Sequence, residues 1–240
     1  MNHILIDVQP SIVTLTLNRE HAGNMLDLPM IHEAAQHIQA ASNHAHCVVI
    51  RGAGANFCLG RDPSTAGPHA TPMALRDQLL LPIMNLYDAI KLSKIPVIAV
   101  VQGQALGLGC AIACACDVTI AEEGALFQLP EMTYHLPPTL AMSALLDKIG
   151  RKATAWMAYS VEKIDAIRAR EMGLVSSVVS KGHLEEDLQR LVDTLTQKEL
   201  MAVLAVKEYL NFAPESGPAV RSMAANLLAL ALSTQAVQKD

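Results

Sequence analysis

The chain has 240 residues, of which 51% are hydrophobic and only 17% are charged. A chain with this much apolar material can bury a substantial core, so the composition excludes intrinsic disorder. The net charge of −5 is spread along the sequence without a cluster of lysines and arginines, and aromatic residues make up only 3%. These properties argue against a nucleic-acid partner, because such proteins need basic surfaces and stacking aromatics.

We expect neither a membrane span nor an export signal. Its apolar runs end well before the roughly 20 residues that a membrane span requires, and residues 1–3 lead directly into a strand-like segment. The five cysteines are an odd number and match neither a disulfide framework nor a CxxC metal pair. We therefore expect a cytoplasmic protein with no membrane partner and no metal, in which the cysteines are small buried side chains.

The first half of the chain alternates strands and helices. Residues 12–17 alternate apolar and polar side chains, and residues 47–52 are a β-rich run that ends on glycine, so both are predicted strands. Between them, apolar positions at helical spacing predict a helix over 29–41. A loop rich in glycine, proline, serine and threonine is expected at 60–72, followed by a long helix over 73–92.

The second half continues with strands and then becomes mostly helical. Residues 97–101 predict a buried strand, and a glycine-bearing turn at 103–109 leads into a helix of small residues. Residues 118–121 predict another strand, and most of the remaining sequence is helical except 174–180. This order of elements predicts an α/β fold around one core. A final alanine- and leucine-rich helix at 218–236 has enough apolar surface to suggest a subunit contact.

Two glycine-bearing turns are the candidates for a functional site. The first has the sequence NFCLGRD at 56–62, and the second has QGQALGLG at 102–109. Main-chain N–H groups at such turns lack helical acceptors, and two of them together can hold one developing negative oxygen. Glycine at a strand-to-helix turn more commonly serves backbone geometry alone, and the residues by themselves leave that alternative open.

Five segments carry a further pattern: LNRE with NML at 17–26, FCLGRD at 57–62, the run from IPVIAVVQG to ACD at 95–117, FQLPE at 127–131, and DA to GLV at 165–175. In order and in register, they resemble motifs of the crotonase superfamily, also called the enoyl-CoA hydratase/isomerase family. The resemblance covers nearly the whole chain. It implies a crotonase-like spiral of ββα units with C-terminal trimerisation helices.

The resemblance also implies how the chain is divided and what it binds. Residues 1–190 would form the core with the CoA site and the active site, and residues 191–240 a helical trimerisation region. The partners would be an acyl-CoA thioester substrate and further copies of the chain, in a homotrimer or a dimer of trimers. No separate cofactor is implied, because coenzyme A is part of the substrate.

In the family, two main-chain N–H groups form an oxyanion hole for the thioester carbonyl. By motif position these donors fall on Arg61 and Leu108. Because the donor is the main chain, the side chains at these positions need not match the family pattern, provided that the backbone conformation is kept. Gly60, Asp62 and Gly107 would line the same substrate site, and hydrogen bonding by Asp62 would fix the first turn.

The family's acid and base positions differ in this chain. Hydratases of the family use two glutamates, whereas here Ala111 stands at the first position and only Glu131 remains. Loss of one acid or base group commonly costs about 10²–10⁴ in rate, so we expect hydration to suffer. One carboxylate beside an enolate is enough to move a double bond. We therefore expect Glu131 to act as acid and base, with isomerisation favoured over hydration.

Several alternatives stay open at this point. Glu131 could be an ordinary surface or helix-start carboxylate, and the chain could be a catalytically silent acyl-CoA-binding subunit. Thioester hydrolysis and decarboxylation also need an oxyanion hole but use other proton carriers. His135 is a further candidate proton carrier, since its pKa suits that role. For the phosphates of CoA, the basic candidates are Arg19, Arg61 and Lys207.

Overall fold

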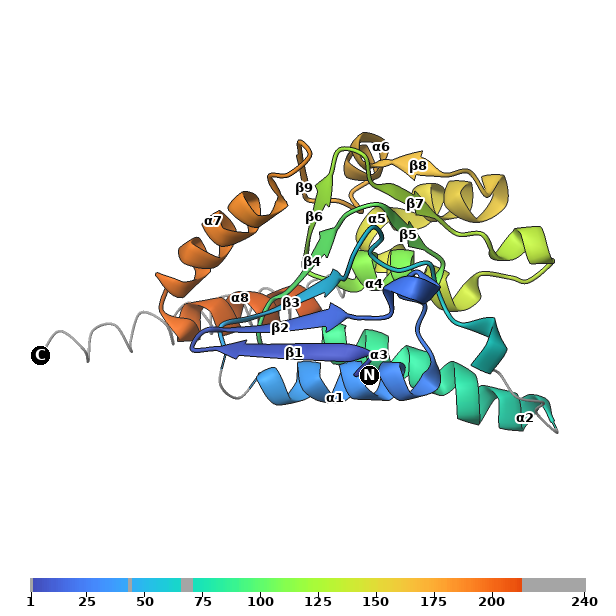
Figure 1. The fold of residues 1–240 in the computed structure, drawn as a ribbon, viewed down its shortest axis with the longest axis horizontal. Coiled ribbons are helices and arrows are strands. Elements are labelled where there is room, and N and C mark those ends of the chain that lie inside the picture. Colours follow the sequence, from blue (N-terminus) through green and yellow to red (C-terminus); the bar gives the residue numbers. More distant parts are fainter. Residues whose placement is uncertain (1, 43–44, 66–70, 213–240) are drawn as a thin grey trace, which may run out of the picture.

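The structure is a computed structural model, and it describes residues 2–42, 45–65 and 71–212. The helix predicted at 218–236 lies outside these residues, as does most of the predicted trimerisation region. Figure 1 shows an α/β arrangement with helices around a central sheet. The predicted fold class is therefore confirmed.

A six-stranded sheet forms the centre of the described chain. Its strands, in spatial order, are β1 (Ile4–Gln9), β2 (Ile12–Leu17), β3 (Cys47–Gly52), β4 (Val97–Val101), β6 (Val118–Glu122) and β9 (Ser177–Val179). Only β1 and β2 pair antiparallel, whereas the pairs from β2 to β9 are parallel. Parallel neighbours need crossover connections, and helices supply most of them here. All three strands expected at 12–17, 47–52 and 97–101 have the predicted bounds.

The helices are α1 (Leu28–Ala41), α2 (Pro72–Leu75), α3 (Leu81–Lys91), α4 (Leu108–Ala115), α5 (Thr139–Ser160), α6 (Ala166–Glu171), α7 (Leu184–Thr196) and α8 (Leu200–Phe212). Helix α1 begins at a capping residue, because Asp27 Oδ1 accepts the N–H of Met30 at 2.9 Å. A π-helical turn at Arg76–Leu80 joins α2 to α3, so the helix predicted at 73–92 is interrupted by a change of helical pitch. The predicted boundary between residues 190 and 191 falls inside α7, and the division into two regions stays a prediction.

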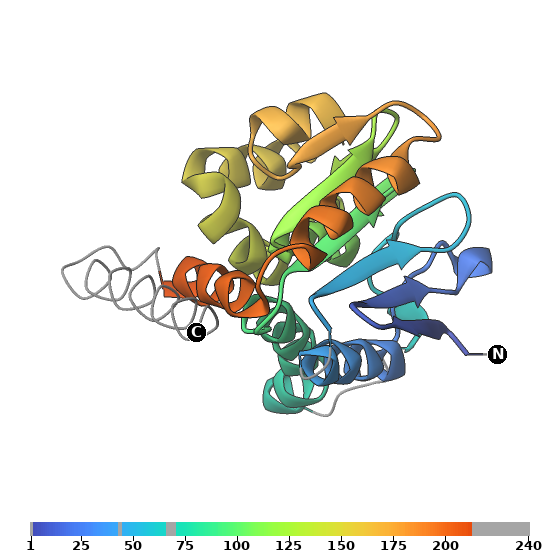
Figure 2. The same ribbon diagram turned by 90° about the vertical axis from the view of Figure 1, so that its left-hand side faces the viewer.

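Different helices cover the two faces of the sheet. Val48 and Ala99 enter the larger core, to which α1, α3, α4 and α5 contribute. Their neighbours Val49 and Val100 point to the opposite face and pack in the smaller core beneath α7. Figure 2 shows α7 crossing this second face. The alternation explains why the central strands are apolar throughout, since both of their faces are buried.

A second, three-stranded sheet holds one of the two glycine-bearing turns. It consists of β5 (Gln104–Leu106), β7 (Leu126–Gln128) and β8 (Ile164–Asp165). The sequence predicted only a turn at 103–109, and β5 within it is a correction. The strand forms because distant segments supply its hydrogen-bond partners: β7 on one side and Cys58, in a bridge to Ala105, on the other. The sheet therefore fixes the second turn against the first.

All five cysteines are buried and unpaired, as expected from their spacing. Within the described part of the chain, no helix has both the length and the apolar character that crossing a membrane requires.

Candidate active site

The two glycine-bearing turns lie side by side. Cys58 donates its N–H to Gln104 O at 3.1 Å and accepts the N–H of Leu106 at 2.9 Å. Just beyond this pairing, a Cβ atom placed on Gly60 would lie 3.2 Å from Leu106 O and 4.0 Å from the nitrogen of Leu108. The chain after Gly60 therefore runs next to the first residue of α4.

The main-chain N–H groups of Arg61 and Leu108 lie at this junction, and neither has an acceptor among the described residues. Their neighbours Asp62 and Gly107, by contrast, donate to carbonyl oxygens at 2.8 and 2.9 Å. Leu108 is the first residue of α4, where N–H groups lack helical acceptors and the helix dipole is positive. Among the described residues, both donors are therefore left without an acceptor where the two turns meet.

Glu131 lies against the residue that precedes Leu108. It begins a 3-10 helix, Glu131–Tyr134, and a Cβ atom placed on Gly107 would lie 3.1 Å from its Oε1 atom. Gly107 has φ 51° and ψ −115°, a backbone conformation that residues with a Cβ rarely adopt. Glycine at 107 therefore allows both the turn into α4 and the close approach of the carboxylate.

Burial raises the pKa of the Glu131 carboxyl above its ordinary value, and hydrogen bonding by its own main-chain N–H opposes part of the rise. The Oε2 atom is buried and has no hydrogen-bond partner among the described residues. A desolvated carboxylate without a partner binds a proton more readily. A carboxyl whose pKa is moved toward neutrality can both accept and return a proton.

The sequence analysis missed two residues near this carboxylate, Tyr87 on α3 and Cys110 on α4. Burial raises the pKa of both side chains, and the nearby Glu131 charge adds to the rise. Tyr87 is only 6% exposed. In the sequence it is one of many apolar positions in a helical pattern, and only the fold brings it near a residue 44 positions later.

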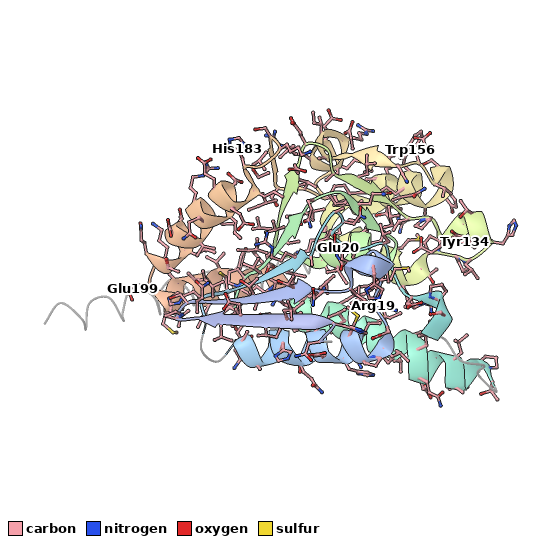
Figure 3. The ribbon with its side chains drawn as sticks, viewed as in Figure 1. Arg19, Glu20, Tyr134, Trp156, His183 and Glu199 are labelled. Carbon is pink, nitrogen blue, oxygen red and sulfur yellow. The ribbon has the colours of Figure 1, made fainter. Side chains whose placement is uncertain are left out.

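Other predicted residues lie differently. Ala111, at the position of the absent glutamate, is buried in α4. Arg61 is half-buried, and its Nη1 atom donates to Asp62 O at 3.2 Å. His135 is exposed, and no hydrogen bond or ion pair joins its imidazole to Glu131 in the described structure. Its neighbour Tyr134 is 71% exposed and lies at the edge of the molecule (Figure 3).

The guanidinium of Arg19 is engaged inside the protein, which corrects the expectation that it meets a phosphate of CoA. Its Nη2 atom lies 2.6 Å from Asp62 Oδ2, and its side chain is only 15% exposed. Figure 3 shows Arg19 close to the strand ends. Asp62 also accepts two hydrogen bonds from Ser64, at 2.9 Å from the N–H and 2.6 Å from the hydroxyl. This agrees with the expectation that Asp62 fixes the turn.

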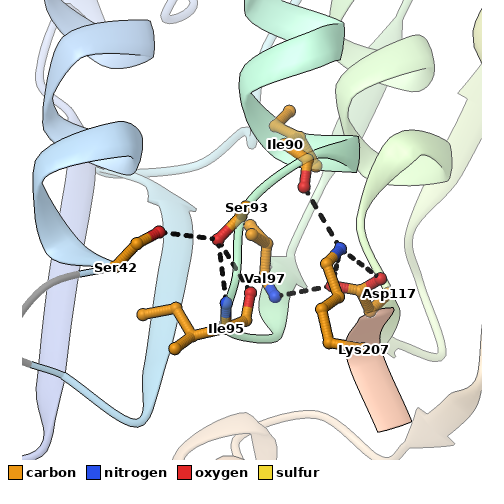
Figure 4. Close-up of polar contacts among 7 residues, drawn as sticks. All are labelled: Ser42, Ile90, Ser93, Ile95, Val97, Asp117 and Lys207. Atoms are coloured by element: carbon orange, nitrogen blue, oxygen red, sulfur yellow. Dashed lines mark hydrogen bonds and ion pairs between the residues drawn. The ribbon is translucent and has the colours of Figure 1, made fainter. Parts of the chain in front are cut away.

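Lys207 is also a correction. Its Nζ atom lies 2.7 and 2.8 Å from the two Asp117 carboxylate oxygens and 3.2 Å from Ile90 O (Figure 4). The residue is only 2% exposed, so its ammonium group is not available to a phosphate in solution. Instead it joins α8 to the start of β6 and the end of α3. The helical pattern of the sequence gives no sign that this lysine faces inward.

Comparisons with known proteins agree with this geometry. The family described as "Enoyl-CoA hydratase/isomerase" matches residues 7–239. The 2,3-dehydroadipyl-CoA hydratase of Escherichia coli (strain K12) is 29% identical over 90% of this chain and 84% of its own length. The short-chain-enoyl-CoA hydratase of Clostridium acetobutylicum is 27% identical over 88% of this chain and 82% of its own length.

Solved structures show the same relationship. The enoyl-CoA hydratase of Mycobacterium smegmatis superposes with a TM-score of 0.91 at 26% identity, covering 97% of this chain and 91% of that one. A Thermobifida fusca YX protein solved in complex with CoA gives a TM-score of 0.89 at 25% identity, covering 98% of this chain and 94% of that one. With a family match over almost its entire length and this fold, the chain belongs to the enoyl-CoA hydratase/isomerase family, the crotonase superfamily.

Proposed function

We propose that the protein is an acyl-CoA enzyme that stabilises a thioester enolate and moves a carbon–carbon double bond, with isomerisation favoured over hydration. The observation that carries this proposal is the Glu131 carboxylate, whose buried Oε2 atom has no partner among the described residues, beside the main-chain N–H groups of Arg61 and Leu108. The position at which family hydratases carry a second glutamate is occupied by Ala111, which has no group to activate water.

In this proposal, the thioester carbonyl oxygen accepts hydrogen bonds from the N–H groups of Arg61 and Leu108. Each such donor is worth about 3 kcal/mol when negative charge develops on the oxygen. Glu131 removes a proton from C2 of a 3-enoyl-CoA, and the electron pair is delocalised into the thioester as a dienolate. The same carboxyl then returns the proton to C4, which leaves a 2-enoyl-CoA and a regenerated carboxylate.

Family membership supports a proposed substrate and a proposed assembly. An acyl-CoA thioester fits the names of the relatives, and coenzyme A arrives as part of the substrate, so no separate cofactor is proposed. Since Arg19 and Lys207 are engaged internally, Arg61 is the one predicted basic group left for a CoA phosphate. We further propose a homotrimer or a dimer of trimers.

The test compares four reactions of the purified protein. We expect conversion of a 3-enoyl-CoA to the 2-enoyl-CoA to exceed hydration of crotonyl-CoA by about 10²-fold, since hydration lacks one of its two groups. Mass spectrometry of saturated acyl-CoA and of a malonyl-type CoA would detect hydrolysis and decarboxylation.

Each outcome of this test has a clear meaning. Hydration that matches or exceeds isomerisation would contradict the proposed preference. Binding of CoA thioesters in calorimetry, together with no turnover in any of the four assays, would favour the silent binding subunit instead. Products of hydrolysis or decarboxylation alone would assign one of those two reactions.

A further inference from the structure

The ion pair between Arg19 and Asp62 adjoins one of the two free donors. It lies between the loop after β2 and the turn that carries Arg61, and both side chains are shielded from water, at 15% and 5% exposure. We propose that Arg19 is a positioning residue for the active site: through Asp62, it holds the N–H of Arg61 in place for the thioester oxygen. This inference rests on the proposed oxyanion hole, but it is independent of the reaction that follows.

On one side, Arg19 is itself held firmly. Its main-chain N–H donates to Asn24 Oδ1 at 2.9 Å, and its Nη1 atom donates to Met25 O at 3.0 Å. Asn24 is fully buried, and its Nδ2 atom donates to the carbonyl oxygens of Ala53 and Asn56, both at 2.8 Å. The main chain of Arg19 is therefore tied through Asn24 to the loop that follows β3, and its guanidinium is bound to its own loop.

On the other side, the residues that flank Arg61 are held by one strand-like bridge. Leu26 donates its N–H to Gly60 O at 2.9 Å and accepts the N–H of Asp62 at 2.8 Å. This alternation leaves the N–H of Arg61, between them, facing away from Leu26. The bridge fixes the direction of that N–H, and the Asp62 carboxylate fixes the end of the bridge, because it binds Arg19 and Ser64.

The charge of Asp62 persists over the working range of an enzyme. Hydrogen bonds from Ser64 and Arg19 lower the pKa of its carboxyl to about 2. A lowered carboxyl pKa stabilises the fold above the ordinary value of 3.8, and this contribution is lost only as the pH falls toward about 2. The position of the Arg61 N–H should therefore not vary with pH near neutrality. Any change of the rate with pH near neutrality should come from the titration of Glu131.

The test is Asp62→Asn, which keeps the shape of the side chain but removes its charge. The measurement is the infrared carbonyl stretch of a bound acyl-CoA thioester, which moves to lower frequency when two donors polarise it. Because a misplacement of about 1 Å can cost 10²-fold in rate, we expect a smaller carbonyl shift and a kcat lower by about 10- to 10²-fold. KM should change by less than about threefold, and the pH profile should keep its shape.

Asp117→Asn is the matched control. Asp117 belongs to a second buried ion pair, 10% exposed at the aspartate, and it lies at the far end of β4 and β6. Loss of this ion pair should lower the free energy of unfolding without changing the carbonyl shift or the kcat of the folded protein. If the role of Asp62 were merely structural, Asp62→Asn would resemble Asp117→Asn: stability would fall, while the carbonyl shift and the kcat of the folded protein would stay unchanged.

Two milder changes cover the case in which Asp62→Asn does not fold. Arg19→Lys should retain more activity and more carbonyl shift than Arg19→Met, because the positive charge remains. Ser64→Ala removes one hydrogen bond to Asp62 from an exposed position and should give a small effect of the same kind.

The proposal is overturned if folded Asp62→Asn, or folded Arg19→Met, gives the wild-type carbonyl shift and a kcat within twofold of wild type. A wild type that shows no carbonyl shift at all would overturn it together with the oxyanion hole. A wild type that shifts the carbonyl but isomerises nothing would contradict the proposed reaction alone.

Discussion

Glu131→Gln is expected to lower the rate of double-bond isomerisation by at least about 10²–10⁴-fold, the usual range for loss of an acid or base group. Glutamine keeps the shape of the side chain but cannot take a proton from one carbon and return it to another. KM should change little, since the main-chain donors of Arg61 and Leu108 are untouched. The measurement is kcat and KM for a 3-enoyl-CoA.

The same substitution is expected to stabilise the fold near neutral pH. Because the pKa of the Glu131 carboxyl is raised, wild type loses stability as the pH rises through that raised pKa, and the loss is absent below the ordinary value of 4.5. The gain in melting temperature of Glu131→Gln should therefore appear above the raised pKa and vanish in acid. A stabilised but inactive variant would show that this carboxylate is kept for chemistry.

Glu162→Gln serves as the control, since Glu162 is exposed and its carboxylate makes no hydrogen bond or ion pair with the site residues in the described structure. It should leave both kcat and melting temperature unchanged. If Glu131→Gln kept more than about half of the wild-type rate, the assignment of Glu131 as the proton carrier would be wrong.

The second large effect is expected for Gly107→Ala. Its positive φ strains any residue with a Cβ, at a cost of order 1–3 kcal/mol, and the new methyl group would lie 3.1 Å from Glu131 Oε1. Relief of either conflict moves the carboxylate or the N–H of Leu108. Since loss of one oxyanion donor costs about 10²–10³ in kcat, we expect a loss of this size, measured on protein that is still folded.

Gly124→Ala is the matched comparison, because a Cβ atom there would meet nothing within 4 Å. Both variants add one methyl group at a glycine, so the difference between them reports the environment of residue 107. Equal kcat values for the two variants would contradict the close approach of Glu131 to the start of α4.

Local patterns in the sequence predicted much of the fold. The strands β2, β3 and β4 have the expected bounds. Each of them shows either alternating apolar residues or an uninterrupted apolar run, and both patterns can be recognised within the segment itself. Strand β5 was not predicted, since its partners are β7 and Cys58. A segment of three residues becomes a strand only when distant segments meet it.

The candidate site was likewise predicted only in part from the sequence. Arg61, Leu108 and Glu131 were identified by their resemblance to family motifs, and the fold brings the two glycine-bearing turns and the carboxylate together. Arg19 and Lys207 were misassigned because a positive charge is visible in a sequence, whereas its partner is not. Asp62 and Asp117 lie 43 and 90 residues away from these two basic residues, and no local pattern connects either pair.

The pair of Lys207 and Asp117 also bears on how the chain is completed during synthesis. Asp117 is made 90 residues before Lys207, so a growing polypeptide carries this carboxylate without its ammonium partner while those 90 residues are added. A buried charge of this kind disfavours closure of the surrounding core. The nascent chain should therefore reach full resistance to proteases only after Lys207 has left the ribosome.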